Sequence, residues 1–265
     1  MADAAPSAAV TAVADGPVLE VTLDRGKANA IDAATSRELS RVFAEFRDNP
    51  DLRIAILTGT GDRFFCAGWD LNAAAGGEEF EADYGEGGFG GFVELPGLLK
   101  PVIAAVNGMA VGGGFEIVLA ADLVVAAEHA RFWLPEASLG LVPDSGSVRL
   151  PRMLPPVVAN EILYAGRRLD AAEALQWGLV NSVVAASELM SEARVLAARV
   201  VEAAPLSVAA VSQIRDRTGH LPLAEAFELL RSGELAAYEA MLGSADAAEG
   251  PTAFAEGRAP RWQGR

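Results

Sequence analysis

Up to about residue 185, the chain alternates between a hydrophobic pattern typical of strands and one typical of helices. Residues 18–24 (VLEVTLD) alternate in polarity and are rich in β-branched side chains, which indicates a strand. Residues 54–59 (IAILTG) form a continuous apolar run ending in glycine, as expected of a strand buried on both faces. Further strand candidates are residues 102–106, 123–127, 131–134 and 179–184.

Helical spacing separates these apolar runs. Leu39, Val42 and Phe46 recur at intervals of three or four residues, and Asp32 stands where an N-cap would satisfy the first free amides. Further helices are expected at residues 113–121, 156–165 and 170–177. The alternation of strands and helices predicts an α/β fold with a largely parallel sheet.

The pattern changes after residue 185, where no strand signal returns. Helical stretches are expected at 186–203, 206–217 and 222–243, with Pro205 and Pro222 where first-turn prolines occur. We therefore divide the chain into a core, residues 1–185, and a helical region, residues 186–265. The helical region needs a further surface on which to bury its apolar face, which favours a role in oligomerisation.

Composition and charge narrow the possible partners. The chain is 51% hydrophobic, which suits a globular protein, and its formal net charge of -15 disfavours binding to nucleic acid or to an anionic membrane surface. An anionic ligand would need a binding site where the local electrostatic potential differs from that of this acidic surface. Cys66 is the only cysteine, so no internal disulfide is possible. The first residues lack the basic n-region of a signal peptide, and we expect a cytoplasmic protein.

A glycine-rich segment from Asn107 to Glu116 is the first candidate for chemistry. Its consecutive glycines suit a turn from strand to helix, where backbone must approach a ligand closely. The free N–H groups at a helix start can hold an oxyanion, with Glu116 in the first helical turn nearby. On spacing alone, a tight turn with glycines needed for packing is the simpler interpretation.

A second candidate turn runs from Phe65 to Asp70, shortly after the apolar run at 54–59. It could present another N–H group to the same oxyanion. Cys66 in this turn has no neighbouring base in the sequence, and we interpret it as a small buried hydrophobe.

Glu136 is the third candidate, because it follows an expected strand and precedes the glycine-containing loop 140–146. It could face a cleft or equally be an exposed residue at a strand end. Two carboxylates in one partly buried site would push each other's pKa apart, as acid and base roles require.

Other motifs carry little weight. Residues 85–90 match G-x-G-x-x-G, but they follow no apolar strand, and we reject a dinucleotide site. His129 and His220 are the only histidines, and neither has ligand-like partners, so we expect no metal site. Ser145 and Ser147 lack the surroundings of a nucleophilic serine.

Taken together, the segments resemble the enoyl-CoA hydratase/isomerase (crotonase) family from about residue 15 to the C-terminus. The resemblance is carried by residues 23–32 (LDRGKANAID), 64–71 (FFCAGWDL), 100–126, 132–146 (FWLPEASLGLVPDSG) and 254–258 (FAEGR). It implies a crotonase-like spiral of ββα turns, with the C-terminal helices forming a trimer or a dimer of trimers. Within the family, KANAID, PDSG and AAEGPTAF are most similar to carnitinyl-CoA dehydratases.

The resemblance also implies roles for matched positions. Glu116 and Glu136 match the catalytic pair of the hydratases, and Trp69 and Gly113 match the two oxyanion-hole amides. The positions that contact CoA in the family correspond to Lys27, Ala28 and Ala67. Two departures stand out: the loop after Asp144 lacks the usual Gly-Gly pair, and Gly257 replaces a lysine, with Arg258 beside it.

The expected function is reversible hydration of a 2-enoyl-CoA, with CoA part of the substrate and no separate cofactor. A carnitinyl substrate carries a quaternary ammonium group, which aromatic faces and carboxylates would hold. We therefore place the substrate pocket at Tyr84, Phe89, Trp133 and Asp144. The alternatives are a general short-chain hydratase, an isomerase, a thioester hydrolase or a non-catalytic acyl-CoA-binding trimer. The acyl group, the physiological direction and the division of roles between the glutamates stay open.

Overall fold

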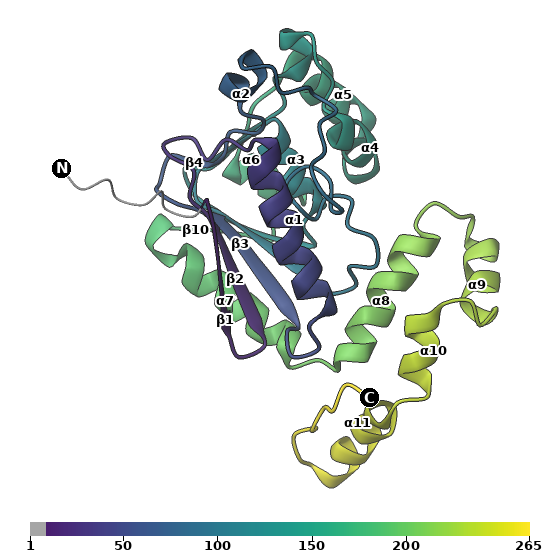
Figure 1. Cartoon of the computed structure of the whole chain (residues 1–265). Helices are drawn as coiled ribbons and strands as arrows, with labels where there is room; N and C mark the ends of the chain where they lie inside the picture. Colours follow the sequence, from purple (N-terminus) through teal and green to yellow (C-terminus); the bar gives the residue numbers. More distant parts are fainter. Residues whose placement is uncertain (1–8) are drawn as a thin grey trace. The chain divides into compact units, whose positions relative to one another are not determined.

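A computed structural model describes residues 9–265 of the chain (Figure 1). Its internal contacts form two compact units. One comprises residues 9–98 with Val102–Ala197, and the other comprises Leu99–Pro101 with Ala198–Arg265. The boundary between them falls inside a helix, later in the chain than the division at residue 185 expected from the sequence.

The first unit contains a six-stranded sheet in the order β1-β2-β3-β5-β7-β10. All neighbouring strands are parallel except β1 and β2, which form an antiparallel pair. The apolar runs of the sequence form its centre, where every residue of β5 is buried, so the expected α/β fold is confirmed. The strands are β1 (Val10–Asp15), β2 (Val18–Leu23), β3 (Ile54–Gly59), β5 (Val102–Val106), β7 (Leu123–Ala127) and β10 (Ser182–Val184).

A second sheet, in the order β4-β6-β8-β9, was not expected from the sequence. The strand expected at 131–134 belongs to it, but its other strands are too short to show a hydrophobic period, which is why the pattern indicated a single sheet. They are β4 (Phe64–Cys66), β6 (Met109–Val111), β8 (Arg131–Trp133) and β9 (Leu169–Asp170). Along the chain, each successive repeat contributes one strand to each sheet and then a helix. This arrangement is the ββα spiral implied by the resemblance.

The helices of the first unit cover these sheets. The apolar stripe of α1 (Ala33–Asp48) is buried, and Asp32 caps it by accepting a hydrogen bond from the Thr35 amide at 2.8 Å, as expected. Residues 76–101, between α2 and β5, contain no helix or strand. The remaining helical elements are α2 (Leu71–Ala75), α3 (Gly113–Ala120), η1 (Glu136–Leu139), α4 (Asp144–Met153), α5 (Pro156–Ala165), α6 (Ala171–Gln176), η2 (Ala186–Glu188) and α7 (Leu189–Val201).

All the regular structure of the second unit is helical, as expected after residue 185. The stretch expected at 222–243 is two helices, because Ser232, Gly233 and Glu234 interrupt it. Helices α8 and α10 lie side by side (Figure 1). The elements are α8 (Pro205–Thr218), α9 (Leu223–Arg231), α10 (Ala236–Leu242) and α11 (Ala245–Glu256). Within residues 9–265 no single helix is long and apolar enough to cross a bilayer. In this part of the chain, only the pair 186–201 and 205–218, which is bent between its two helices, reaches that length and apolar composition when taken together.

Candidate active site

Two glycine turns of the first unit pack backbone against backbone. Gly68 follows β4 with φ +82°, and a Cβ there would lie 2.8 Å from the Gly113 nitrogen and 2.7 Å from the Val111 carbonyl oxygen. Gly114 is equally constrained, because a Cβ there would overlap the Cys66 carbonyl group. Glycine at both positions therefore brings the residues around Trp69 close to the start of α3.

The amides of Trp69 and Gly113 are both free to bind a ligand. Ile31 donates to the Gly68 carbonyl at 2.8 Å and accepts from the Asp70 amide at 2.9 Å. In an extended strand this pairing turns the intervening Trp69 N–H away from Ile31. Gly113 is the first residue of α3, where helical amides have no intrahelical partner. Within residues 9–265 neither N–H donates to another protein group.

Glu116 lies in the first turn of α3, as expected, and is 7% exposed. Its Oε1 accepts a hydrogen bond from the Gly146 amide at 2.7 Å, which ties α3 to the start of α4. Burial, with smaller contributions from the charges of Asp144 and Glu136, raises the pKa of Glu116 to about 8 against the opposing effect of the Gly146 bond. A neutral Glu116 near pH 7 is suited to donate a proton.

Glu136 follows β8 and is 8% exposed, so the exposed alternative is excluded. Its Oε2 is buried without a hydrogen-bond partner among the described residues, while Oε1 lies beside Gly112 at the turn into α3. Burial raises the pKa of Glu136 to about 7, with a further contribution from Asp144. The two glutamates therefore titrate near neutrality, in a site that holds an orphaned carboxylate oxygen.

These groups line one cavity of about 440 Å³ in the first unit. Its carboxyl groups outnumber its other polar side chains, and no lysine or arginine lines it among the described residues. The acidic residues are Glu81, Asp83, Glu94, Glu116, Glu136 and Asp144, and the aromatic ones are Trp69, Phe80, Tyr84 and Phe89. The Trp69 and Phe80 rings meet edge to face, with centroids 5.6 Å apart, and the Tyr84 and Phe89 rings do so at 5.4 Å.

Most residues predicted for the site meet at this cavity. Ala67, Trp69, Tyr84, Phe89, Gly113, Glu116, Glu136 and Asp144 all line it. Lys27 and Ala28 lie outside the lining, although the Ala28 carbonyl accepts from the Ala67 amide at 3.0 Å. Within residues 9–265, no group of three His, Cys, Asp or Glu side chains is arranged to hold a metal ion.

The placement of Trp133 differs from the sequence prediction, because its ring does not line the cavity. It instead lies under the Arg168 guanidinium, 4.7 Å from ring centroid to Cζ. Phe80 takes the place of a fourth aromatic ring in the cavity. It lies in a segment without regular structure, where no pattern in the sequence marks it.

Cys66, at the end of β4, is completely buried, as expected. Its Sγ accepts a hydrogen bond from the Gly68 amide at 3.3 Å, and burial raises the pKa of its thiol to about 12. The thiol is therefore un-ionised at neutral pH and helps to close the turn that carries Trp69.

Comparisons with known proteins agree with this geometry. The enoyl-CoA hydratase/isomerase family model matches residues 14–265. "Carnitinyl-CoA dehydratase" of Proteus mirabilis is 59% identical over 251 residues, covering 94% of this chain and 96% of the relative. The same enzyme of Salmonella typhi is 58% identical, with 95% and 97% covered.

Solved structures of enoyl-CoA hydratases share the fold. The enzyme from Mycobacterium tuberculosis H37Rv superposes with a TM-score of 0.88 at 38% identity, covering 98% of this chain and 100% of that one. The enzyme from Bacillus anthracis also gives a TM-score of 0.88, at 32% identity, with 97% and 100% covered.

Proposed function

This chain belongs to the enoyl-CoA hydratase/isomerase family and is a hydro-lyase of that family, and we propose that its substrate pair is carnitinyl-CoA and crotonobetainyl-CoA. The observation that carries the substrate is the cavity lining, which combines aromatic rings and carboxylates without a lysine or arginine. A quaternary ammonium group cannot donate N–H hydrogen bonds, so aromatic faces and negative charge are the groups that attract it.

The two free amides would hold the thioester oxygen. Trp69 and Gly113 N–H groups donate to it as negative charge develops in the enolate, and one such donor is typically worth about a hundredfold or more in rate. Because both donors are backbone groups in packed turns, they require little reorganisation during the reaction.

Two buried carboxyl groups whose pKa values are both raised toward neutrality suit one base and one acid role in dehydration. Glu136 takes the proton from Cα and leaves the electron pair in the enolate. Glu116 protonates the hydroxyl at Cβ as the C–O bond breaks, and water departs. Hydration reverses both transfers through the same singly protonated pair, and solvent exchange restores the starting state. Side chains thus complete the chemistry, with CoA as part of the substrate.

A comparison of charged and neutral substrates tests the specificity. The neutral control is 5,5-dimethylhex-2-enoyl-CoA, in which a carbon atom replaces the quaternary nitrogen of crotonobetainyl-CoA at nearly the same shape. We expect kcat/KM to be higher for the cationic thioester, by a ratio that corresponds to about 0.5–2 kcal/mol for each cation–π contact. Equal values would leave a general short-chain enoyl-CoA hydratase.

The assembly belongs to the same proposal. Helices of the second unit expose large apolar side chains, which a trimer or a dimer of trimers would cover. They include Val211, Leu223, Phe227, Leu242 and Phe254, the last of which is 89% exposed. Sedimentation should give a closed trimer or its dimer, and a stable monomer at micromolar concentration would contradict this. We also propose a cytoplasmic location, because a single cysteine fits a reducing compartment, and cell fractionation tests it.

A further inference from the structure

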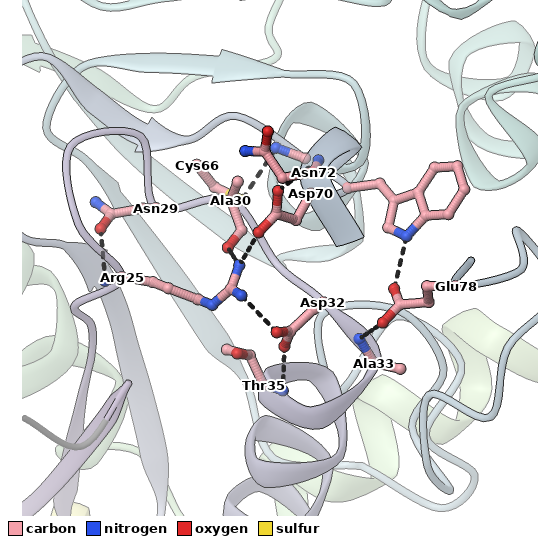
Figure 2. Close-up of polar contacts among 12 residues, drawn as sticks. Arg25, Asn29, Ala30, Asp32, Ala33, Thr35, Cys66, Asp70, Asn72 and Glu78 are labelled. Atoms are coloured by element: carbon pink, nitrogen blue, oxygen red, sulfur yellow. Dashed lines mark hydrogen bonds and ion pairs between the residues drawn. The ribbon is translucent and has the colours of Figure 1, made fainter. Parts of the chain in front are cut away.

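Arg25, in the loop that follows β2, joins two chain segments that lie far apart in the sequence (Figure 2). Its guanidinium donates to the Ala30 carbonyl at 2.5 Å and to the Asp70 carboxylate at 2.7 Å, and it forms an ion pair with Asp32. Its side chain is 26% exposed, and those of Asp32 and Asp70 are 22% and 15% exposed. The three groups therefore form a partly buried bridge beside the turn that carries Trp69.

Each aspartate in this bridge also begins a helix. Asp32 caps α1, and Asp70 caps α2 by accepting from the Asn72 amide at 2.9 Å. Burial opposes their ionisation, but the helix amides and Arg25 outweigh it and lower the pKa of both carboxyl groups. Without Arg25, two carboxylates would face each other across the gap and repel.

The Trp69 amide lies on one of the two bridged segments, directly before Asp70, and points away from the other. Its orientation depends on the backbone hydrogen bonds of Ile31 with Gly68 and Asp70, at 2.8 and 2.9 Å. Ile31 directly precedes Asp32, so these hydrogen bonds lie next to the bridge formed by Arg25. The Trp69 ring has its own anchor, because its Nε1 donates to Glu78 at 2.7 Å. Glu78 in turn accepts from the Ala33 amide at 3.0 Å (Figure 2). Arg25 itself does not line the cavity.

We propose that Arg25 is a positioning residue for catalysis, which holds the Trp69 amide in the direction of the thioester oxygen by clamping Asp32 to Asp70. This inference rests on the proposed function, because it assumes that the Trp69 amide is an oxyanion donor. An arginine suits the task, since its planar fork reaches three acceptors at once, whereas the single ammonium of lysine cannot. If the Trp69 N–H is turned slightly away from the thioester oxygen, the stabilisation that it provides falls most in the transition state, where negative charge develops.

The test compares Arg25→Ala with Arg167→Ala. Arg167 is a matched control, because it also bridges two carboxylates, Glu161 and Glu173, but lies outside the cavity and the Trp69 turn. We expect Arg25→Ala to lower kcat by about 10- to 100-fold with KM changed by less than about threefold, and Arg167→Ala to change neither by more than about twofold. Guanidinium ion at non-denaturing concentration should restore part of kcat only in Arg25→Ala.

An infrared readout separates orientation from folding. Hydrogen bonds lower the stretching frequency of a carbonyl, so bound butyryl-CoA with a 13C-labelled thioester carbonyl reports on the donors without turnover. The unmodified protein and Arg167→Ala should show the full lowering, and Arg25→Ala a smaller one. If Arg25→Ala does not fold, Arg25→Lys is measured in the same way, with intermediate losses expected.

The possible failures are distinct. No lowering of the carbonyl frequency in the unmodified protein would refute the oxyanion hole itself, and with it the proposed mechanism. Full lowering and normal kcat in Arg25→Ala, or in Arg25→Lys, would overturn only the role of Arg25. A lower melting temperature with normal kcat would also overturn it, because the clamp would then be merely structural.

Discussion

The two walls of the cavity are built from different parts of the polypeptide. One wall combines the catalytic pair proposed above, Glu116 and Glu136, with the backbone turns at Gly68 and Gly112–Gly114, which follow short strands and leave no room for a Cβ; we call it the backbone wall. The other wall is made of side chains: those of residues 80–94, where there is no helix or strand, and that of Asp144 at the start of α4. The difference suggests that the backbone wall carries the reaction common to the family and that the side-chain wall selects the acyl group.

The largest expected effect comes from breaking the backbone wall. Gly113→Pro removes one oxyanion N–H and should lower kcat by about a thousandfold or more. Gly113→Ala keeps the amide but pushes its Cβ against the Phe89 ring, so it should retain more activity. Steady-state kinetics on variants with a normal circular dichroism spectrum measure both, and an active Gly113→Pro enzyme would place the donor elsewhere.

The glutamate pair comes next. Glu116→Gln and Glu136→Gln keep the shape of the side chains but cannot exchange a proton, and each should lower kcat by about a hundredfold or more. Because the two groups act in one sequence of proton transfers, their effects on kcat should not multiply. The loss of kcat in the double variant should be much smaller than the product of the two single losses. Near-normal kcat in either single variant would refute the paired-carboxylate mechanism.

Changes in the side-chain wall should affect selectivity more than the rate itself. Tyr84→Leu should lower the preference for crotonobetainyl-CoA over its neutral isostere by about 2- to 30-fold, as expected for the loss of a cation–π contact. Asp144→Asn should lower the same ratio by removing a negative charge from the lining. The ratio is the useful quantity, because a change in the glutamate pKa values affects both substrates alike. An unchanged ratio in both variants would show that this wall does not recognise the charge.

The smallest expected effect is a shift in the pH profile of kcat/KM, which tests the electrostatic coupling between Asp144 and the two glutamates. For dehydration, kcat/KM should fall below about pH 7, as Glu136 becomes protonated, and above about pH 8, as Glu116 loses its proton. In Asp144→Asn both limbs should move to lower pH, because Asp144 raises the pKa of both glutamates. A profile that is flat between pH 6 and pH 9 would contradict these assignments.

Folding stability should show the cost of the raised Glu116 pKa. A raised folded-state pKa contributes stability that is complete below the unfolded pKa of about 4.5 and is lost as pH rises through about 8. Glu116→Gln should therefore gain stability relative to the unmodified protein over this window, by ~1–3 kcal/mol at its upper end. Denaturant unfolding at pH 5 and pH 8 measures the difference, which should vanish in acid.

The sequence predicts the backbone wall better than the side-chain wall. The glycines around Gly113 and the carboxyl of Glu116 have meaning at a strand-to-helix turn, and the structure puts them there, although it also inserts strand β6 between Asn107 and Gly112. In contrast, residues 76–101 have no period, so nothing in the sequence separates Phe80, which lines the cavity, from Trp133, which does not. Strand β8 fixes the direction of the Trp133 side chain through contacts with the second sheet, which local patterns do not contain.

The buried thiol of Cys66 can report how often the turn that carries Trp69 opens. Its thiol is sealed beneath Gly68 and Gly114, so an alkylating reagent can reach it only when the turn opens. Because the chain has no other cysteine, the rate of alkylation reports that local opening alone. The rate at which the turn that carries Trp69 opens can thus be measured in the native protein without introducing a label.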